Sequence, residues 1–285
     1  MKALLFGADG QDGPYIAESC RARGLDPVSV TRAEGDVSDF AVVDGLVRRH
    51  RPEVVFQLAA ISTTRHDALF ENHGAIATGT LNVLESVHRS GKGTKVFVVG
   101  SAVQFLNSGM PISEETPFVA QSPYAVARIH SVFAARYYRS LGVRSYVGYL
   151  FNHESPNRTP GHVSRDVVDA VAHIAEGRST FFEIGDLSTR KEWTFAGDIA
   201  EAILTLVHQD AIHEAVIGSG ETHSIEEWVG ECFSLRGLDW RKYVRRVSGF
   251  KAEYQTLASD PARIRSLGWR PRVSFHELAA MMSGL

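Results

Sequence analysis

The chain has 285 residues, 44% of them hydrophobic, and its 30 basic and 33 acidic residues give a net charge of -3. This length accommodates one large α/β domain with a smaller appended lobe. The nearly balanced charge argues against nucleic acid or an anionic membrane as a partner, so we expect any phosphate to be bound locally. Because the first apolar run, residues 3–6, is too short for a secretion signal or a membrane span, we expect a cytoplasmic protein.

Five short β-type runs alternate with segments in which apolar residues recur every three or four positions. This alternation predicts repeated βαβ units. Continuous apolar runs fit strands of a parallel sheet that is buried on both faces. We therefore predict a Rossmann-type, doubly wound parallel α/β sheet. The five runs are residues 3–6, 28–30, 54–58, 96–99 and 144–150, and helical faces are expected from Phe40, Val43, Leu46 and Val47 and from Ile76, Val83, Leu84 and Val87.

The regular alternation weakens after Phe151, where asparagine, proline and glycine crowd together up to residue 161. Such crowding indicates a functional loop or a domain boundary. We predict a dinucleotide-binding domain over residues 1–155, to which residues 195–210 return. A smaller C-terminal α/β substrate lobe would comprise residues 156–194 and 211–285. Within it, residues 260–282 are expected to form two packed helices separated by a turn at 268–271.

Three glycines, Gly7, Gly10 and Gly13, directly follow the first predicted strand and precede a helix that begins near Pro14. Glycines at this spacing allow a tight turn and let a pyrophosphate approach the helix N-terminus. The alternative is an ordinary turn between a strand and a helix. The strand before and the helix after the glycines favour dinucleotide binding.

The end of the second strand selects between the two nicotinamide dinucleotides, because an acidic residue there would bind the adenosine ribose hydroxyls. This chain has Arg32 and no carboxylate before Glu34. The planar guanidinium suits a 2′-phosphate, so we predict NADP rather than NAD. A solvated arginine at a strand end is the alternative. Further cofactor contacts are expected from Asp36 and Val37 beside the adenine and from Leu58, Ala59 and Ala60 after the third strand.

Tyr124 and Arg128 lie four residues apart in a predicted helix, which places them on one face. A tyrosine that acts as an acid or base near neutral pH needs a nearby positive charge to stabilise its phenolate. Ser101, after the fourth strand, could hold a substrate hydroxyl beside Tyr124. A packed helix surface is the alternative, and the preceding glycine motif favours the catalytic interpretation. Neither the two cysteines nor the twelve histidines show a metal-ligand spacing, so we predict no metal.

Three motifs carry a resemblance to a known family: GADGQDG at residues 7–13, SPYAVA at 122–127 and LFNHESP at 150–156. The chain resembles the extended short-chain dehydrogenase/reductases (the NAD-dependent epimerase/dehydratase superfamily), and most of all the GDP-mannose 4,6-dehydratases. The resemblance implies a nucleotide-diphosphate sugar as substrate and a homodimer. It also implies that Gln11 and Asp12 contact the cofactor, that Tyr124 is the acid/base, that Ser101 takes the catalytic serine/threonine position and that Asn152 contacts the substrate.

Two positions depart from the family pattern. Arg128 replaces the lysine that follows the tyrosine, and Val103 replaces the glutamate that removes the C5 proton during dehydration. His153 or Glu154 would have to supply that base. The usual nucleotide-binding arginine is not evident near residues 250–253, so the candidate substrate contacts are Asn152, Glu154, Arg158, Lys191 and Arg245.

These features predict an NADP-dependent enzyme that transfers hydride at C4 of a nucleotide sugar, in the manner of a GDP-mannose 4,6-dehydratase. Because Val103 cannot take a proton, a 4-keto-sugar-nucleotide reductase or a C4 epimerase stays open as an alternative. The loss of both the lysine and the glutamate also leaves open a noncatalytic dinucleotide-binding protein.

Overall fold

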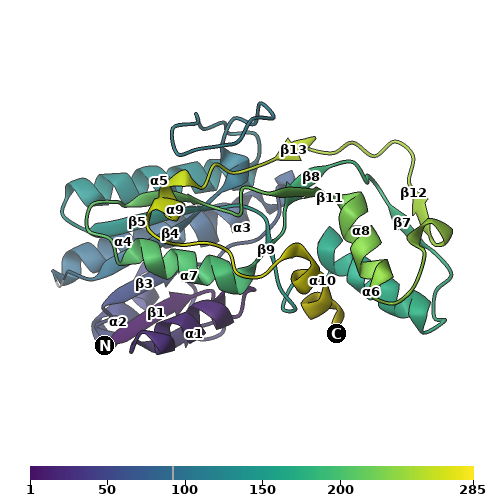
Figure 1. Cartoon of the computed structure of the whole chain (residues 1–285). Helices are drawn as coiled ribbons and strands as arrows, with labels where there is room; N and C mark the ends of the chain where they lie inside the picture. The colour runs from purple at the N-terminus through teal and green to yellow at the C-terminus, as the bar shows by residue number, and fades with distance from the viewer. Residues whose placement is uncertain (92) are drawn as a thin grey trace.

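The computed structural model describes residues 1–91 and 93–285. Its main element is a six-stranded sheet in the order β10-β5-β4-β3-β1-β2, and every neighbouring pair in it is parallel (Figure 1). This topology confirms the predicted Rossmann-type fold. The strands are β1 (Lys2–Phe6), β2 (Asp26–Val30), β3 (Val54–Gln57), β4 (Lys95–Ser101), β5 (Arg144–Leu150) and β10 (Glu214–Ile217).

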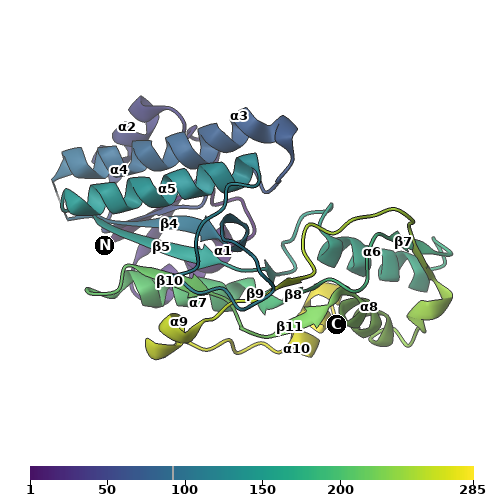
Figure 2. The same cartoon turned by 90° about the horizontal axis from the view of Figure 1, so that it is seen from above.

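Helices cover both faces of this sheet (Figure 2). The helices α2 (Phe40–His50), α4 (Gly79–Ser90) and α5 (Pro123–Ser140) pack on one face, and α1 (Gly13–Ala22) and α7 (Ala196–Val207) pack on the other. Successive side chains of a strand point to opposite faces. Accordingly, Leu4 and Phe6 of β1 belong to the first core, whereas Ala3 and Leu5 belong to the second. The continuous apolar run of β1 is explained by these two cores.

The segment before α4 departs from the single helical face predicted for residues 76–87. A π-helical turn, η2 (His73–Thr78), precedes α4 and displaces Ile76 from the row formed by Val83, Leu84 and Val87. Ile76 packs instead against Ala127 of α5, apart from the sheet core. The wider turn of a π-helix shifts the phase of the following residues. Short turns flank this region: η1 (His66–Ala68), α3 (Leu69–Asn72) and, after β4, η3 (Ala102–Gln104).

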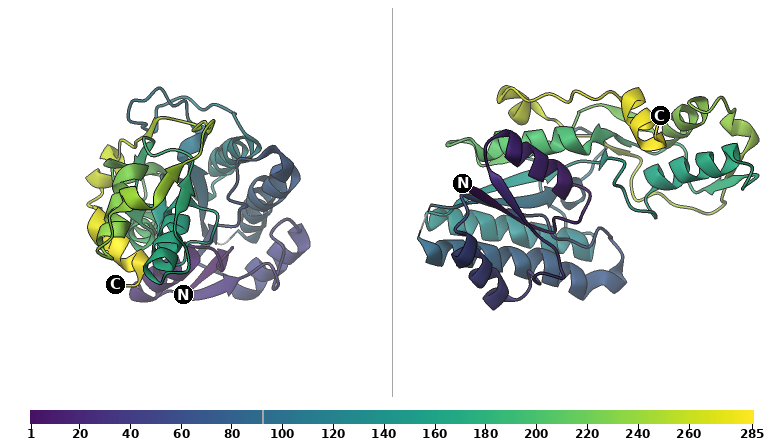
Figure 3. Two further views of the ribbon diagram at one scale, coloured as in Figure 1. Left: turned by 90° about the vertical axis from the view of Figure 1, so that its right-hand side faces the viewer. Right: turned by 90° about the horizontal axis from the view of Figure 1, so that it is seen from below.

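A smaller lobe stands beside the sheet domain and carries the C-terminus (Figures 1 and 3). Its core contains Trp193 stacked on Trp228, with ring centroids 4.5 Å apart. In the described part of the chain, no helix is long and apolar enough to cross a membrane. The remaining helices are α6 (Val163–Ala175), α8 (Ile225–Ser234), η4 (Trp240–Lys242), α9 (Ala262–Ser266) and α10 (Phe275–Ser283), and the remaining strands are β6 (His153–Glu154), β7 (Phe182–Ile184), β8 (Arg190–Glu192), β9 (Thr194–Phe195), β11 (Thr222–Ser224), β12 (Val244–Arg246) and β13 (Thr256–Leu257).

Segments after the predicted stretch 195–210 also belong to the sheet domain. β10, which the sequence analysis placed in the lobe, pairs with β5 and extends the main sheet. The two tail helices also divide between the two parts, because α9 packs on β10 whereas α10 packs on α6 and α8. Trp269 anchors the segment between them in the sheet domain, where its Nε1 donates to the Asp198 carbonyl at 2.8 Å.

Candidate active site

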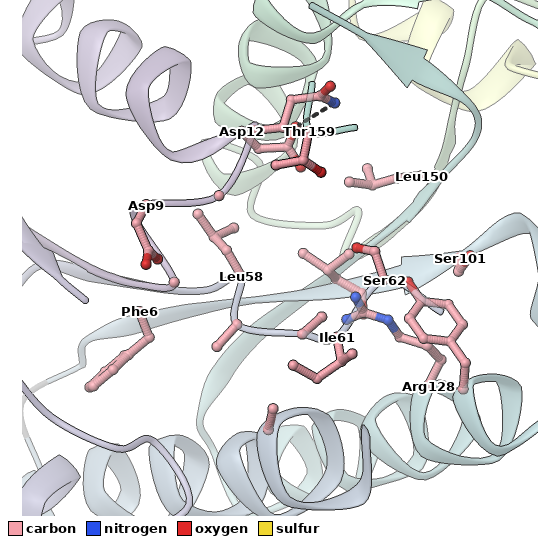
Figure 4. A pocket seen from close by; sticks show the side chains of 18 of the residues that line it. Phe6, Asp9, Asp12, Leu58, Ile61, Ser62, Ser101, Arg128, Leu150 and Thr159 are labelled. Atoms are coloured by element: carbon pink, nitrogen blue, oxygen red, sulfur yellow. Dashed lines mark hydrogen bonds between the residues drawn. The ribbon is translucent and has the colours of Figure 1, made fainter. Parts of the chain in front are cut away.

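A cavity of about 790 Å³ opens at the carboxyl ends of the parallel strands. It lies around the position where the strand order reverses, between β1 and β3, which is where ligands bind in open α/β sheets. Loops that follow β1, β2, β3, β4 and β5 all contribute side chains, α5 adds two, and the lobe closes one side (Figure 4). The cavity is therefore lined by both the sheet domain and the lobe.

The glycine loop forms the part of the cavity next to β1. Gly7 has a φ of +78°, and a Cβ on it would lie 2.6 Å from the Ala59 backbone nitrogen. A Cβ on Gly13 would lie 2.1 Å from the Ala8 carbonyl oxygen, so only glycine lets α1 begin this close to the loop that follows β1. Among the described residues, none accepts a hydrogen bond from the backbone amides of Gln11 or Asp12. These free amides beside a helix N-terminus fit a pyrophosphate.

The residues after β2 line the far end of the same cavity. The exposed side chain of Arg32 lies there together with Asp36 and Val37. The Glu34 carboxylate turns away and accepts hydrogen bonds from the Thr31 backbone amide at 2.8 Å and hydroxyl at 3.1 Å. Hydrogen bonds from the Ser38 amide and hydroxyl lower the pKa of Asp36. Arg32 is therefore the charged side chain of this strand end that remains available to a ligand phosphate.

Tyr124 and Arg128 share one face of α5, as their spacing predicts. The Ser122 hydroxyl caps this helix by accepting from the Ala125 amide at 3.1 Å. The Arg128 guanidinium lies 4.9 Å from the centroid of the Tyr124 ring, and its Nη1 donates to the Val99 carbonyl at 2.8 Å. The arginine is only 4% exposed, and its Nε has no acceptor among the described residues. A buried positive charge thus lines the cavity beside the phenol.

Ser101 and Val103 line the cavity beyond the end of β4, and Figure 4 shows Ser101 near Arg128. Ser101 is the last residue of β4, and its amide donates to the Gln104 side-chain oxygen at 2.8 Å. Gln104 itself is fully buried behind the cavity wall. The apolar Val103 side chain therefore occupies the position where the resemblance implies a proton-accepting carboxylate.

The two residues that could replace this missing base are already engaged. His153 Nε2 faces Asp12 Oδ1 at 2.9 Å, and its Nδ1 faces the Phe151 carbonyl at 2.7 Å. Glu154 is 3% exposed and accepts from Arg158 Nε and from the Ser164 hydroxyl, both at 2.7 Å. Burial by itself would raise the pKa of Glu154, but the charges of Arg158 and Lys191 hold it below its ordinary value. His153 therefore offers no free basic nitrogen, whereas both hydrogen bonds to Glu154 fall on its Oε2 and no described residue bonds to its Oε1.

The structure brings together four of the five candidate substrate contacts. Asn152, Glu154, Arg158 and Lys191 all line the cavity on the side of the lobe. Lys191 is buried, burial lowers its pKa, and its ammonium lies 4.5 Å above the Trp193 ring. Arg245 lies elsewhere, on β12, where its guanidinium stacks 4.1 Å from the Phe181 ring centroid.

Some lining residues were not anticipated from the sequence. Asn157, Thr159 and His162 reach the cavity from the loop between β6 and α6, and Ser62 reaches it from the loop after β3. The crowding of asparagine, proline and glycine marked the first loop as functional, but it did not single out residues. In the described part of the chain, no three histidine, cysteine or acidic side chains gather as a metal site. A second cavity, of about 410 Å³, lies in the lobe and shares Lys191 with the first.

Comparisons with known proteins identify the family of the chain. The profile of the GDP-mannose 4,6 dehydratase family matches residues 25–282. GDP-mannose 4,6 dehydratase 2 of Arabidopsis thaliana is 31% identical over 98% of this chain and 85% of its own length. The GDP-mannose 4,6-dehydratase of Vibrio cholerae is 28% identical over 99% of this chain and 92% of its own length.

Solved structures show the same fold. RMD from Pseudomonas aeruginosa complexed with NADPH superposes with a TM-score of 0.89 at 19% identity, over 99% of this chain and 97% of that one. The UDP-glucose 4-epimerase of Thermus thermophilus in complex with NAD gives 0.86 at 21% identity, over 100% and 98%. The fold and the cavity define an extended short-chain dehydrogenase/reductase. Within that class, the chain belongs to the GDP-mannose 4,6 dehydratase family.

Proposed function

We propose that this protein binds NADP in the cavity and acts on a nucleotide-diphosphate sugar at C4, as a GDP-mannose 4,6-dehydratase-like enzyme. One observation carries the proposal: the phenol of Tyr124 and the buried charge of Arg128 face the same cavity as the glycine loop. The names of the relatives support GDP-mannose as the first substrate to test. The buried Lys191, shared between the two cavities, would hold the substrate diphosphate, with Asn152 and Arg158 beside it.

The preference for NADP over NAD rests on the end of β2. Arg32 lines the cavity there, whereas Glu34 is bound to Thr31. A guanidinium can bind a 2′-phosphate with two parallel hydrogen bonds. A carboxylate, which would bind ribose hydroxyls, is missing from that position. Asp36 and Val37 would then contact the adenine, and Leu58, Ala59 and Ala60 would lie along the dinucleotide.

Each step of the proposed reaction is assigned to a particular residue. The nicotinamide of a bound dinucleotide supplies a hydride acceptor or donor at C4. Tyr124 takes the proton of the C4 hydroxyl during oxidation and returns it during reduction. Arg128 stabilises the phenolate by its charge, and its guanidinium, which lines the cavity, would donate to the nicotinamide ribose. Ser101 positions the C4 oxygen beside Tyr124.

The residues available as a base for the C5 proton favour a second function. Dehydration requires a base for the C5 proton. Val103 cannot act as one, His153 pairs with Asp12, and the charge of Arg158 lowers the pKa of Glu154 and so weakens it as a base. A 4-keto-sugar-nucleotide reductase or a C4 epimerase needs only the tyrosine, the serine and the dinucleotide. We therefore keep the reductase and the epimerase as the second candidate.

Product analysis separates these activities. Purified protein is incubated with GDP-mannose and NADP, and the sugar is examined by mass spectrometry and NMR. A dehydratase yields a 4-keto-6-deoxy product that is lighter by one water. A reductase leaves GDP-mannose unchanged but oxidises NADPH when a 4-keto nucleotide sugar is supplied. Tyr124→Phe is the control, since it should abolish turnover while cofactor binding persists, and a wild type that leaves both the sugars and NADPH unchanged would refute the proposal.

We also propose that the protein is a homodimer formed through α5. Val126, Phe133 and Tyr137 are between 45% and 60% exposed and lie on one face of that helix. An apolar helix face of this kind is typical of an interface between subunits. Light scattering on a sizing column would report the mass, and a monomer at micromolar concentration would contradict the proposal. The cytoplasmic location expected from the sequence stays a prediction.

A further inference from the structure

Asp12 stands at the start of α1 but does not cap it. An aspartate in this position usually accepts hydrogen bonds from the first free amides of the helix. Here the backbone of Asp12 is already helical, with φ -86° and ψ -25°, and its side chain makes no capping hydrogen bond. Pro14, within the first turn, has no amide hydrogen to donate. The carboxylate therefore lies beside the glycine loop of residues 7–13, here called the cradle, without accepting a hydrogen bond from its amides.

A negative charge in this place works against an anionic ligand. The loop of residues 7–13 offers free amides and the positive end of the α1 dipole, both of which attract phosphate. An uncompensated Asp12 carboxylate would repel a pyrophosphate bound there and would compete with it for the amides. The chain thus needs a group that neutralises Asp12 and turns it away.

His153 meets this need. It lies 141 residues away, in the short strand β6 that follows β5, and its Nε2 is 2.9 Å from Asp12 Oδ1. Its Nδ1 is 2.7 Å from the Phe151 carbonyl, so both ring nitrogens face acceptors. Two acceptors favour the doubly protonated, cationic ring. Burial alone would lower the pKa of His153, but the Asp12 carboxylate outweighs burial and raises it.

Two further contacts fix the same loop. Gln11 donates from its side-chain Nε2 to the His153 carbonyl at 3.1 Å, and Arg158 donates to that carbonyl as well. The His153 ring is only 13% exposed and the Asp12 side chain 23% exposed, so solvent screens the pair weakly. The pair is therefore held from both sides and has little freedom to separate.

From this geometry we infer that His153 is a positioning residue for the cofactor: it neutralises Asp12 and holds its carboxylate off the free amides of Gln11 and Asp12, which keeps the cradle open to a dinucleotide pyrophosphate. The inference rests on the proposed function, because it presupposes that a dinucleotide binds in this loop. It assigns His153 a role in cofactor affinity and none in proton transfer to the sugar.

A cycle of variants tests the inference through the dissociation constant of NADP, measured by calorimetry on the full chain. We expect His153→Gln to weaken binding about tenfold, which corresponds to about 1.4 kcal/mol, because the freed carboxylate opposes the pyrophosphate. Adding Asp12→Asn to this variant should restore affinity to within about threefold of the wild type. A residue that served packing alone would show no such rescue. Asp12→Asn by itself should bind NADP at least as tightly as the wild type.

His276→Gln is the matched control, because His276 also pairs with a carboxylate, Glu231 at 2.5 Å, but on the exposed surface of the lobe. It should leave the dissociation constant unchanged. Unchanged binding in a folded His153→Gln variant, or a double variant that stays tenfold weaker than Asp12→Asn, would overturn the inference. If His153→Gln does not fold, the inference is tested by comparing the NADP dissociation constants of the double variant and Asp12→Asn. A wild type that binds neither dinucleotide overturns the proposed function itself, and this inference with it.

Discussion

Replacing Gly13 by alanine tests whether the close contact between the start of α1 and Ala8, in the loop after β1, shapes the dinucleotide cradle. The added Cβ would meet three backbone atoms of Ala8, at 2.1, 2.5 and 2.7 Å. Ordinary carbon contacts are no closer than about 3.5 Å, so a separation of more than about 1 Å is required between two backbones. Backbone atoms cannot move aside as a flexible side chain can. The helix must therefore shift as a whole.

We expect this substitution to destabilise the fold by about 3 kcal/mol, the upper end of the usual cost of overpacking. Because the free amides of Gln11 and Asp12 directly precede the shifted helix, NADP affinity should fall in the same variant. Gly45→Ala is the matched control, since Gly45 lies within α2 with no heavy atom within 4 Å of the added Cβ. That change should stabilise the fold by about 0.5 to 1 kcal/mol.

Urea unfolding followed by circular dichroism gives both stabilities, and calorimetry gives the affinity. The expected order of stability is Gly45→Ala, then the wild type, then Gly13→Ala. If Gly13→Ala matched the wild type in stability and in NADP binding, the close approach of α1 to Ala8 would not be what the glycine provides. The account of the cradle given above would then be refuted.

Three further predictions concern selectivity, chemistry and pH. Arg32→Ala should weaken NADP binding at least tenfold and leave NAD binding unchanged in calorimetry. Val103→Glu should raise dehydration of GDP-mannose by about 100-fold in the product assay, because it adds the missing general base. Burial alone would raise the pKa of Glu214, but hydrogen bonds from Arg136 and Tyr149 outweigh it and lower that pKa to about 2 from about 4.5. This difference contributes about 3 kcal/mol of stability that is present above about pH 4.5 and lost as pH falls toward about 2, and Glu214→Gln should remove that pH dependence in urea unfolding.

Local sequence patterns were sufficient for the parts of the site that lie on single elements. The glycine loop between β1 and α1 could be predicted because adjacent residues determine both the geometry of the turn and the start of the helix. Tyr124 and Arg128 share a face because four residues make about one helical turn. The strands of the main sheet could be predicted in the same way, since a parallel sheet buried on both faces requires continuous apolar residues.

The tertiary structure alone decided which distant segments meet. β10 has four residues and no local pattern that separates a sheet strand from a lobe strand, so only its pairing with β5 assigns it. The same holds for Arg245, whose basic surroundings gave no sign that it stacks on Phe181 rather than facing the cavity. Asp12 and His153 are 141 residues apart, and their charge pairing depends on how β5 and β1 are placed in the sheet. Such contacts follow from the packing of whole elements, which short-range periodicity does not encode.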